Sequence, residues 1–217
     1  GQQRAVLHHE DVAGRALGHE AVVADQDGLG AARIHRHLSQ QHSICLLCFV
    51  RPGDTPEYLE HLRKYCAQII TVPIHRSRIR DGLAFLKSLV RQVPFLITRD
   101  ESQAMNRSLE ALLAKEQFDC IHADQLWMAP YALLAQKIAR KSGGQPRLLL
   151  DQHNAVHLIP KRMASEAHHP IVLWGMDREA QLMAKYEVEI CQKFDQVVWV
   201  TKEDYQAVQG KAEQLNR

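Results

Sequence analysis

The chain has 217 residues, 46% of them hydrophobic, and carries 27 Lys and Arg against 25 Asp and Glu, a formal charge of +2. This length and composition suit one globular domain with a core, and so mild a positive charge argues against a nucleic-acid partner. No apolar run approaches the roughly 20 residues of a membrane-spanning helix, and the N-terminus lacks a signal-peptide layout, so the sequence favours a cytoplasmic protein.

The cysteines and histidines give little indication of a disulfide or a metal site. Five cysteines without regular spacing do not describe a disulfide framework. Cys45 and Cys48 have CxxC spacing, but both lie inside Ile44–Val50, an apolar run typical of a buried strand, where cysteines behave as small hydrophobes. The thirteen histidines lack nearby Cys or carboxylate residues at ligand spacing. We therefore expect reduced thiols and no bound metal.

From about residue 31 onward, short apolar runs alternate with longer amphipathic stretches, the pattern of a parallel sheet covered by helices. The predicted strands are Ile44–Val50, Ile69–Val72, Phe118–Ala123, Arg147–Leu150 and Gln196–Thr201. The predicted helices are Arg33–Gln41, Pro56–Tyr65, one that opens in Arg76–Asp81 and stops at Pro94, Glu101–Lys115, Trp127–Lys141, Pro170–Lys193 and Glu203–Gln209. We predict an α/β fold with a Rossmann-like parallel sheet covered by helices.

Residues 1–30 fit this pattern poorly. Val6–His8 and Ala21–Ala24 are weak strand candidates separated by polar residues and glycines. A doubly wound domain normally has its first strand here, followed by a glycine-bearing loop, and Gly28 and Gly30 stand at about the right place for one. We therefore separate an uncertain N-terminal segment, 1–30, from a Rossmann-like domain, 31–217.

Polar residues gather after two of the predicted strands. Ligands of open α/β sheets bind at the carboxyl ends of the strands, so these residues are the candidates for a site. The first group follows Phe118–Ile121 and the second follows Leu148–Leu150. The candidates are His122, Asp124, Gln125, Asp151, Gln152, His153 and Asn154. They would present hydrogen-bond donors, acceptors and titratable imidazoles at one rim.

Each group also has a structural interpretation. His122 can be satisfied within the fold and Asp124 can cap the next helix, and for this pair we favour structure. Helix capping can likewise explain Asn154. His153, however, stands among amide-bearing residues and suits hydrogen bonding to a polyol, so for the second group we favour function.

Several short runs, in a fixed order along the chain, carry a family resemblance. The runs are Phe118–Asp124, Leu149–Asn154, Lys185–Glu187, Phe194–Val198 and Val200–Asp204, and the helix at Ile34–Leu38 before a strand also fits. In order and spacing they resemble the N-terminal domain of family-4 glycosyltransferases. The resemblance covers about residues 31–208.

The resemblance implies a GT-B enzyme, in which two Rossmann-like domains face a cleft and transfer sugar from a nucleotide-sugar donor to a saccharide or lipid-linked glycan. It implies no cofactor and no metal, and assigns 31–217 to the acceptor side. The family's C-terminal nucleotide-sugar domain has no counterpart in these residues, so the chain is expected to be inactive alone.

The resemblance also implies roles for the candidate residues. The histidine matching His153 reaches the donor sugar and is the catalytic candidate, and a glycine loop, here Gly28 and Gly30, approaches the donor phosphates. The implied substrate contacts are His122, Asp124, Gln125, Asp151 and Asn154. Sugar transfer needs an oriented oxocarbenium-like centre and a stabilised leaving phosphate, so hydrogen bonds matter more than a strong nucleophile.

Two other interpretations stay open. A non-catalytic α/β module would use the same rim to bind a sugar or nucleotide, and an interaction protein would dock a partner on the helix through Arg76–Leu89. The basic run also suits an anionic acceptor or the inner face of a membrane, although such runs are more often solvated helix starts. The residues of that surface are Arg76, Arg78, Arg80, Leu83, Phe85 and Leu86.

The remaining large or charged residues have ordinary expectations. Trp127, Trp174 and Trp199 are expected to pack in the fold rather than to stack on sugar rings. Arg162 and Glu187 are expected to be exposed charges on helices.

Overall fold

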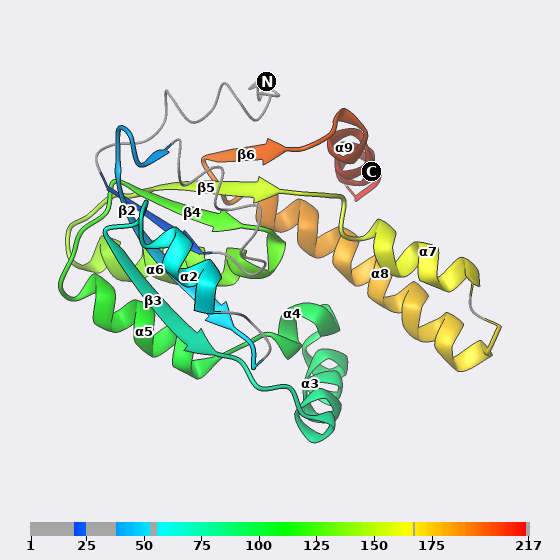
Figure 1. Ribbon diagram of the computed structural model, residues 1–217. Coiled ribbons are helices and arrows are strands. Elements are labelled where there is room, and N and C mark those ends of the chain that lie inside the picture. Colours follow the sequence, from blue (N-terminus) through cyan, green and yellow to red (C-terminus); the bar gives the residue numbers. More distant parts are fainter. Residues whose placement is uncertain (1–19, 25–37, 53–55, 167, 216–217) are drawn as a thin grey trace. The chain divides into compact units, whose positions relative to one another are not determined.

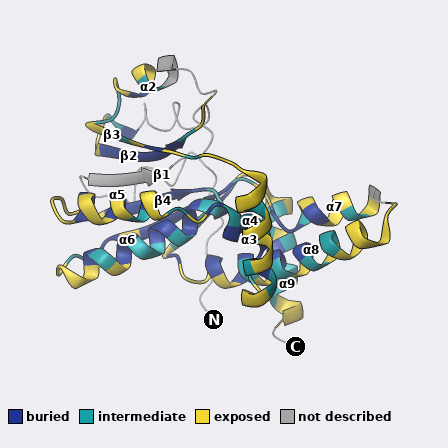
Figure 2. Cartoon of the chain, turned by 90° about the horizontal axis from the view of Figure 1, so that it is seen from below, coloured by how far each residue is buried: buried dark blue, intermediate teal, exposed yellow. Residues whose placement is uncertain are grey.

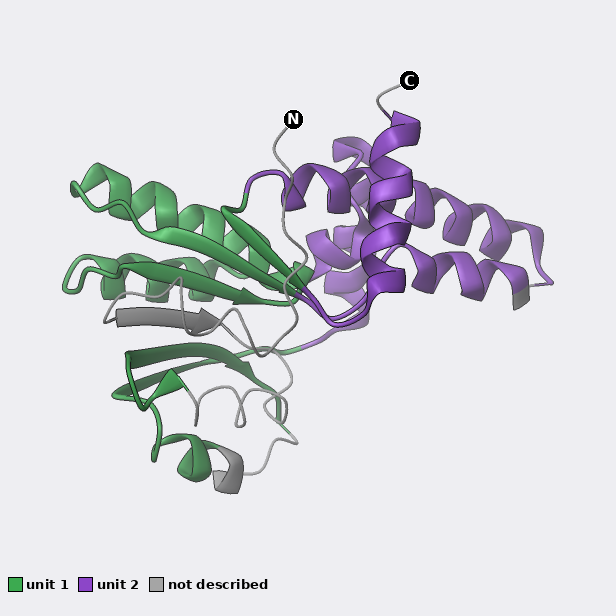
Figure 3. Ribbon diagram, turned by 90° about the horizontal axis from the view of Figure 1, so that it is seen from above, with its two compact units in different colours: residues 1–75, 102–151, 194–198 green, residues 76–101, 152–193, 199–217 purple. Residues whose placement is uncertain are grey.

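The structure is a computed structural model that describes residues 20–24, 38–52, 56–166 and 168–215. The predicted strand Val6–His8 and the loop glycines Gly28 and Gly30 lie outside these residues, as does most of the predicted helix Arg33–Gln41. The chain divides into two compact units (Figure 3). Unit 1 comprises 1–75, 102–151 and 194–198, and unit 2 comprises 76–101, 152–193 and 199–217.

Unit 1 is built on a six-stranded sheet (Figure 1). Its strands are β1 (Glu20–Ala24), β2 (Ser43–Val50), β3 (Gln68–Pro73), β4 (Cys120–Asp124), β5 (Arg147–Gln152) and β6 (Gln196–Trp199). The spatial order is β3-β2-β1-β4-β5-β6, and the β1–β2, β1–β4, β2–β3 and β4–β5 pairs are parallel. This is the strand order of the doubly wound Rossmann fold. The predicted fold class is therefore confirmed, and so is the weak strand candidate Ala21–Ala24.

The centre of the sheet is buried on both faces, as its near-continuous apolar sequence requires. In β2, Ile44, Leu46 and Leu47 are at most 1% exposed, and Cys45 and Cys48 are buried among them as predicted. Alternating side chains of a strand point to opposite faces, so a run buried at every position needs cover on both. Buried cysteines here pack as small apolar side chains.

The described helices of unit 1 are α2 (Pro56–Leu62), α5 (Gln103–Leu113) and α6 (Ala129–Lys141), the last preceded by the short 3-10 turn η1 (Leu126–Met128). The α5 helix starts where the Ser102 hydroxyl accepts a hydrogen bond from Met105 N at 3.3 Å. Its apolar side chains are buried at Met105, Leu109, Leu112 and Leu113, as the helical spacing predicts. The α6 helix ends before Gly143, whose φ of 85° favours glycine.

Unit 2 is helical and is organised around α8 (Pro170–Cys191). Its other helices are α3 (Arg78–Arg91), α4 (Phe95–Arg99), α7 (Leu158–Glu166) and α9 (Lys202–Leu215). The sequence did not predict α4 and α7, because α4 has only five residues and Pro160 lies near the start of α7. Among the described residues, no helix combines the length and apolar character needed to cross a membrane.

Three sequence expectations are wrong. Strand β5 continues past Leu150, so Asp151 and Gln152 are its last residues and not a following loop. Glu187 is 0% exposed, because it lies on the buried face of α8, four residues after the fully buried Met183. Trp174 is 59% exposed, at the exposed start of α8, whereas Trp199 is buried as expected. Figure 2 shows this division of α8 into buried and exposed parts.

Candidate functional site

The strand order of unit 1 marks one place for a ligand. Successive strands run outward from β1 through β2 to β3, and the chain then returns to place β4 on the other side of β1. In this fold, ligands bind in the crevice at the carboxyl ends of the strands where the order reverses. Here β1 ends at Ala24, opposite Ala123 of β4. The end of β4 is therefore part of the expected site.

Three of the predicted site residues share one face of the sheet at this edge. In the parallel register, His122 pairs with Leu149, and Asp124 pairs with Asp151. Register partners and alternate residues of a strand point to the same face, so His122, Asp124 and Asp151 do so. Their exposed fractions are only 5%, 6% and 3%. A carboxylate oxygen of Asp124 and one of Asp151 lie within 4.8 Å of each other.

Gln125 follows β4 in a backbone conformation that is unusual for a residue with a side chain. Its φ of 71° and ψ of 160° fall in a region that belongs almost to glycine alone, at a cost of about 1–3 kcal/mol. Three hydrogen bonds hold it there: Gln125 N donates to Asp151 O at 2.9 Å, Met128 N donates to Gln125 O at 3.1 Å, and Trp127 Nε1 donates to Gln125 Oε1 at 2.5 Å. Strained backbone of this kind clusters at ligand sites.

The helix-capping interpretations do not hold. The residue before η1 is Gln125 rather than Asp124, and no side chain caps that turn. Asn154 lies four residues before α7 begins at Leu158, and its carbonyl oxygen accepts a hydrogen bond from Gln152 Nε2 at 3.0 Å. His153 is half-buried and Asn154 is exposed, and both follow β5 directly in the chain.

The loop that carries His153 is fixed by Glu187, a residue that sequence reasoning missed. Glu187 Oε1 accepts hydrogen bonds from Gln152 Nε2 at 2.5 Å and from Val156 N at 2.8 Å. Its Oε2 accepts one from His157 N at 3.4 Å and lies 2.6 Å from His157 Nδ1. One fully buried carboxylate therefore holds the loop before and after His153. The signal was available in the sequence, because a Glu on the apolar face of a helix must be paired within the fold.

Asp204 of α9 provides a second anchor for this loop. Its Oδ1 accepts a hydrogen bond from Ala155 N at 2.8 Å, and its backbone N donates one to the Thr201 hydroxyl oxygen at 3.1 Å. Both carboxylates that anchor the loop belong to runs that the family resemblance includes. The runs that carry the resemblance therefore include both residues that support the loop.

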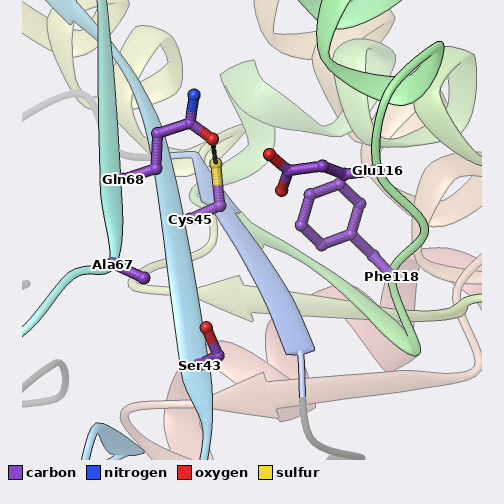
Figure 4. Close-up of a pocket in the computed structure, with 6 residues that line it drawn as sticks. All are labelled: Ser43, Cys45, Ala67, Gln68, Glu116 and Phe118. Atoms are coloured by element: carbon purple, nitrogen blue, oxygen red, sulfur yellow. Dashed lines mark hydrogen bonds between the residues drawn. The ribbon is translucent and has the colours of Figure 1, made fainter.

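A separate cavity of about 260 Å³ lies at the other end of the strands, away from their carboxyl ends (Figure 4). It is lined by Ser43, Cys45, Ala67, Gln68, Glu116 and Phe118. Ser43 and Gln68 begin β2 and β3, so this is the amino-terminal edge of the strands. Burial, with Glu116 and Cys66 adding to it, raises the pKa of Cys45 to about 12. The thiol therefore stays protonated at neutral pH and is a poor nucleophile or metal ligand.

The described residues offer limited groups for a cofactor or metal. Asp124 and Asp151 have the hard oxygen atoms that a divalent cation accepts, but two carboxylates supply only part of the six or more ligands that Mg²⁺ or Ca²⁺ takes. Gly28 and Gly30, the candidates for donor phosphates, lie outside the described residues. The expectation of no bound metal stays a prediction.

No protein-family model matches the chain, and no curated protein matches its sequence. Among solved structures it is similar to an NADH-dependent reductase, A1-R′, complexed with NAD, with 13% identity, 85% of this chain and 76% of that chain covered, and a TM-score of 0.39. It is also similar to an α,α-trehalose-phosphate synthase (UDP-forming) from Burkholderia vietnamiensis, with 14% identity and a TM-score of 0.44. That match covers 92% of this chain and 43% of the synthase. The Rossmann-like assignment rests on the strand order itself.

Proposed function

We propose that this chain provides the acceptor-side domain of a GT-B glycosyltransferase, with the carboxyl ends of β4 and β5 in the wall of its sugar cleft. The observation that carries the proposal is the grouping of His122, Asp124 and Asp151 on one face at the edge where strand order reverses. The ordered resemblance from Phe118 to Asp204 supports it, and the strained Gln125 at the same edge agrees with a ligand site.

The proposed roles follow from the accessibility of each side chain. His153 is half-buried and Asn154 exposed, so they are the groups that contact the sugar, with His153 donating a hydrogen bond to the donor sugar. Asp124 and Asp151 are buried carboxylates whose proposed role is to accept hydrogen bonds from the substrate. Gln125 sets the path of the chain out of β4. Glu187 positions the loop rather than contacting sugar.

The donor nucleotide is proposed to bind mainly to a second Rossmann-like domain. Hydrogen bonds from a preorganised rim are worth most where charge develops, here at the sugar ring and the leaving phosphate. The proposed partners are a nucleotide-sugar donor and a glycan or lipid-linked acceptor. No cofactor beyond the nucleotide sugar is required by this scheme.

The first test is nucleotide release from a panel of nucleotide sugars by the full-length protein that carries this chain. His153→Ala should lower the rate about a hundredfold, the usual loss for one transition-state hydrogen-bond donor. The matched control is His168→Ala, which removes an exposed imidazole from the turn before α8 and should leave the rate unchanged. Folded protein that releases no nucleotide from any donor would contradict the proposal.

The second test separates half of an enzyme from a self-sufficient binding module. Calorimetry of residues 1–217 against nucleotide sugars and free saccharides should show weak binding, since the proposed donor contacts lie mainly in another domain. Tight binding that His153→Ala leaves unchanged would favour the non-catalytic sugar- or nucleotide-binding module instead.

A further inference from the structure

Helix α3 of unit 2 presents a continuous apolar stripe to solvent. The stripe consists of Ile79, Leu83, Leu86 and Val90, whose exposed fractions are 78%, 62%, 58% and 86%. Their spacing of four, three and four residues places all of them on one side of the helix. A stripe of this kind is normally the side on which a helix packs against its own protein, and here it faces outward.

The opposite side of α3 already attaches the helix to unit 2. Ser88 is 0% exposed, its carbonyl oxygen accepts a hydrogen bond from Arg178 Nη2 at 2.9 Å, and its hydroxyl donates to Val93 O at 2.7 Å. Phe85 packs edge-on against Phe95 of α4, with ring centroids 6.0 Å apart. The outward stripe is therefore not needed to hold α3 in place.

Cationic side chains flank the stripe on both sides. At about 100° per residue, Arg80, Lys87 and Arg91 fall along one flank, and Arg78 falls on the other. Lys87 and Arg91 pair with Glu101. Arg78 and Arg80 lie at the start of the helix and are exposed. The only carboxylate within α3 is Asp81. An apolar stripe between two cationic flanks has the charge pattern of a helix that lies in a membrane interface.

We propose that α3 binds the surface of a bilayer with anionic headgroups, its stripe in the acyl boundary and its arginines on the lipid phosphates. The 14-residue helix is about 21 Å long and carries charge on both flanks, so it suits an orientation in the plane of the surface. Anionic lipid is the occupant that complements the charge of α3, because the phosphates of an anionic bilayer lie on both sides of the inserted stripe and so face both cationic flanks.

This surface would also serve the proposed function, although its binding to lipid does not depend on it. If the glycosyltransferase proposal is correct, a domain held at an anionic membrane would meet a lipid-linked acceptor there. The two proposals fail separately. Vesicle binding is measured without any sugar, and nucleotide release is measured with a water-soluble acceptor and no vesicles.

The experiment is co-sedimentation of the full 217-residue chain with vesicles. Phosphatidylcholine vesicles are compared with vesicles that also contain phosphatidylglycerol, at low and high salt. The wild-type chain should bind the anionic vesicles, more weakly at high salt, and should bind pure phosphatidylcholine poorly. No binding of the folded chain to anionic vesicles would overturn the proposal.

Two pairs of variants test the two parts of the surface. Leu83→Asp with Val90→Asp should abolish vesicle binding. The control is Val200→Asp with Leu215→Asp, which adds the same charge at half-exposed apolar positions elsewhere and should lower vesicle binding far less. Arg78→Gln with Arg80→Gln should lower the partition coefficient about 25-fold, fivefold for each arginine. The control, Arg107→Gln with Arg140→Gln, removes two exposed arginines from α5 and α6.

All four variants change exposed residues, and circular dichroism melting checks that each is folded. If a stripe variant binds as the wild type does, or if each control weakens binding as much as its test variant, α3 is not the lipid surface. If the chain instead forms a dimer that the stripe variant dissolves, and vesicles are not bound, a second copy of the chain is the occupant and the proposal is wrong.

Discussion

Glu187 Oε2 lies 2.6 Å from His157 Nδ1, and both side chains are buried, at 0% and 3% exposure. The same carboxylate also accepts hydrogen bonds from Gln152 Nε2, Val156 N and His157 N. Together with His157 Nδ1, four donors between Gln152 and His157 therefore meet on the Glu187 carboxylate of α8. A buried carboxylate with several hydrogen bonds is a strong local constraint, because losing it leaves each of its partners unsatisfied.

Glu187→Ala should therefore destabilise the protein by about 3–5 kcal/mol, the usual result of breaking a buried charged network on one side. Urea unfolding measures the loss. Glu189→Ala on the same helix is the matched control, because Glu189 is half-exposed and forms a long ion pair, 3.8 Å, with the exposed Lys185. It should cost less than about 1 kcal/mol. Equal losses for the two variants would show that the Glu187 network does not support the loop.

The second carboxylate of α8 makes a more local prediction. Glu179 is 8% exposed, and its two oxygens accept hydrogen bonds from Phe95 N at 2.9 Å and Leu96 N at 3.1 Å, the first amides of α4. Pro94, the residue before α4, makes no side-chain hydrogen bond that caps the helix, and Glu179 supplies this cap instead. Glu179→Ala should cost about 1.5–3 kcal/mol, because hydrogen bonds to charged groups are the stronger class.

Hydrogen exchange distinguishes this local role from a general one. In Glu179→Ala, the amides of α4 should exchange faster while those of α5, in the other unit, keep their protection. Glu179→Gln retains one oxygen acceptor and should show a smaller effect. If both variants lose protection evenly throughout the chain, Glu179 is a core residue and not the cap of α4.

The buried thiols predict how stability depends on alkaline pH. Burial raises the pKa of Cys45 and of Cys120 to about 12, and of Cys66 to about 11, from the ordinary thiol pKa of 9.0. The folded state therefore keeps these protons while the unfolded state begins to release them near pH 9. The contribution of these raised pKa values to the free energy of unfolding is present in full below that pH and is lost progressively between about pH 9 and pH 12.

The same shifts should slow chemical labelling, since the thiolate is the reacting form. At pH 8 a thiol reagent should modify the native chain slowly, with the half-buried Cys66 first, and urea should release rapid labelling of all five cysteines. Cys66→Ser should remove the first phase only. Rapid native labelling of Cys45 and Cys48 would instead support a reactive CxxC pair.

Much of the sheet could be predicted from sequence, because its buried strands are continuous apolar runs. The run Ile44–Val50 corresponds to β2, and the helical spacing of Met105, Leu109 and Leu112 corresponds to the buried face of α5. The sequence pattern places the end of β5 at Leu150, two residues too early, because Asp151 and Gln152 are polar. They stay in the strand because Asp151 pairs with Asp124 of β4, a contact between distant parts of the sequence.

The supports of the candidate site were harder to predict for the same reason. Glu187 is a charged residue whose partners lie about 30 positions away in the chain, so propensity alone favoured an exposed position. The five-residue α4 has no periodic pattern of its own, and its start depends on Glu179 from α8, 84 residues beyond Phe95. The apolar face around Glu187 indicates that its carboxylate is buried and paired, but the residues nearby in the sequence do not identify the partners of Glu187 or of Glu179.

Gln125 provides a test in which backbone and side-chain effects separate. Gln125→Ala loses the hydrogen bond from Trp127 Nε1 and keeps a side chain at a φ of 71°, whereas Gln125→Gly loses the same bond and relieves the strain. The Gly variant should therefore be the more stable of the two by about 1 kcal/mol or more, measured by urea unfolding.

The control pair is Gln206→Ala and Gln206→Gly, at an exposed position inside α9, where Ala should be the more stable by about 1 kcal/mol. A reversal of the order between the two sites would demonstrate strain at the end of β4. The presence of Gln at a position that favours Gly would then be explained by its side chain, whose oxygen accepts the Trp127 hydrogen bond at the carboxyl end of β4. If Ala is the more stable residue at both sites, Gln125 is not strained, and the candidate site loses that line of support.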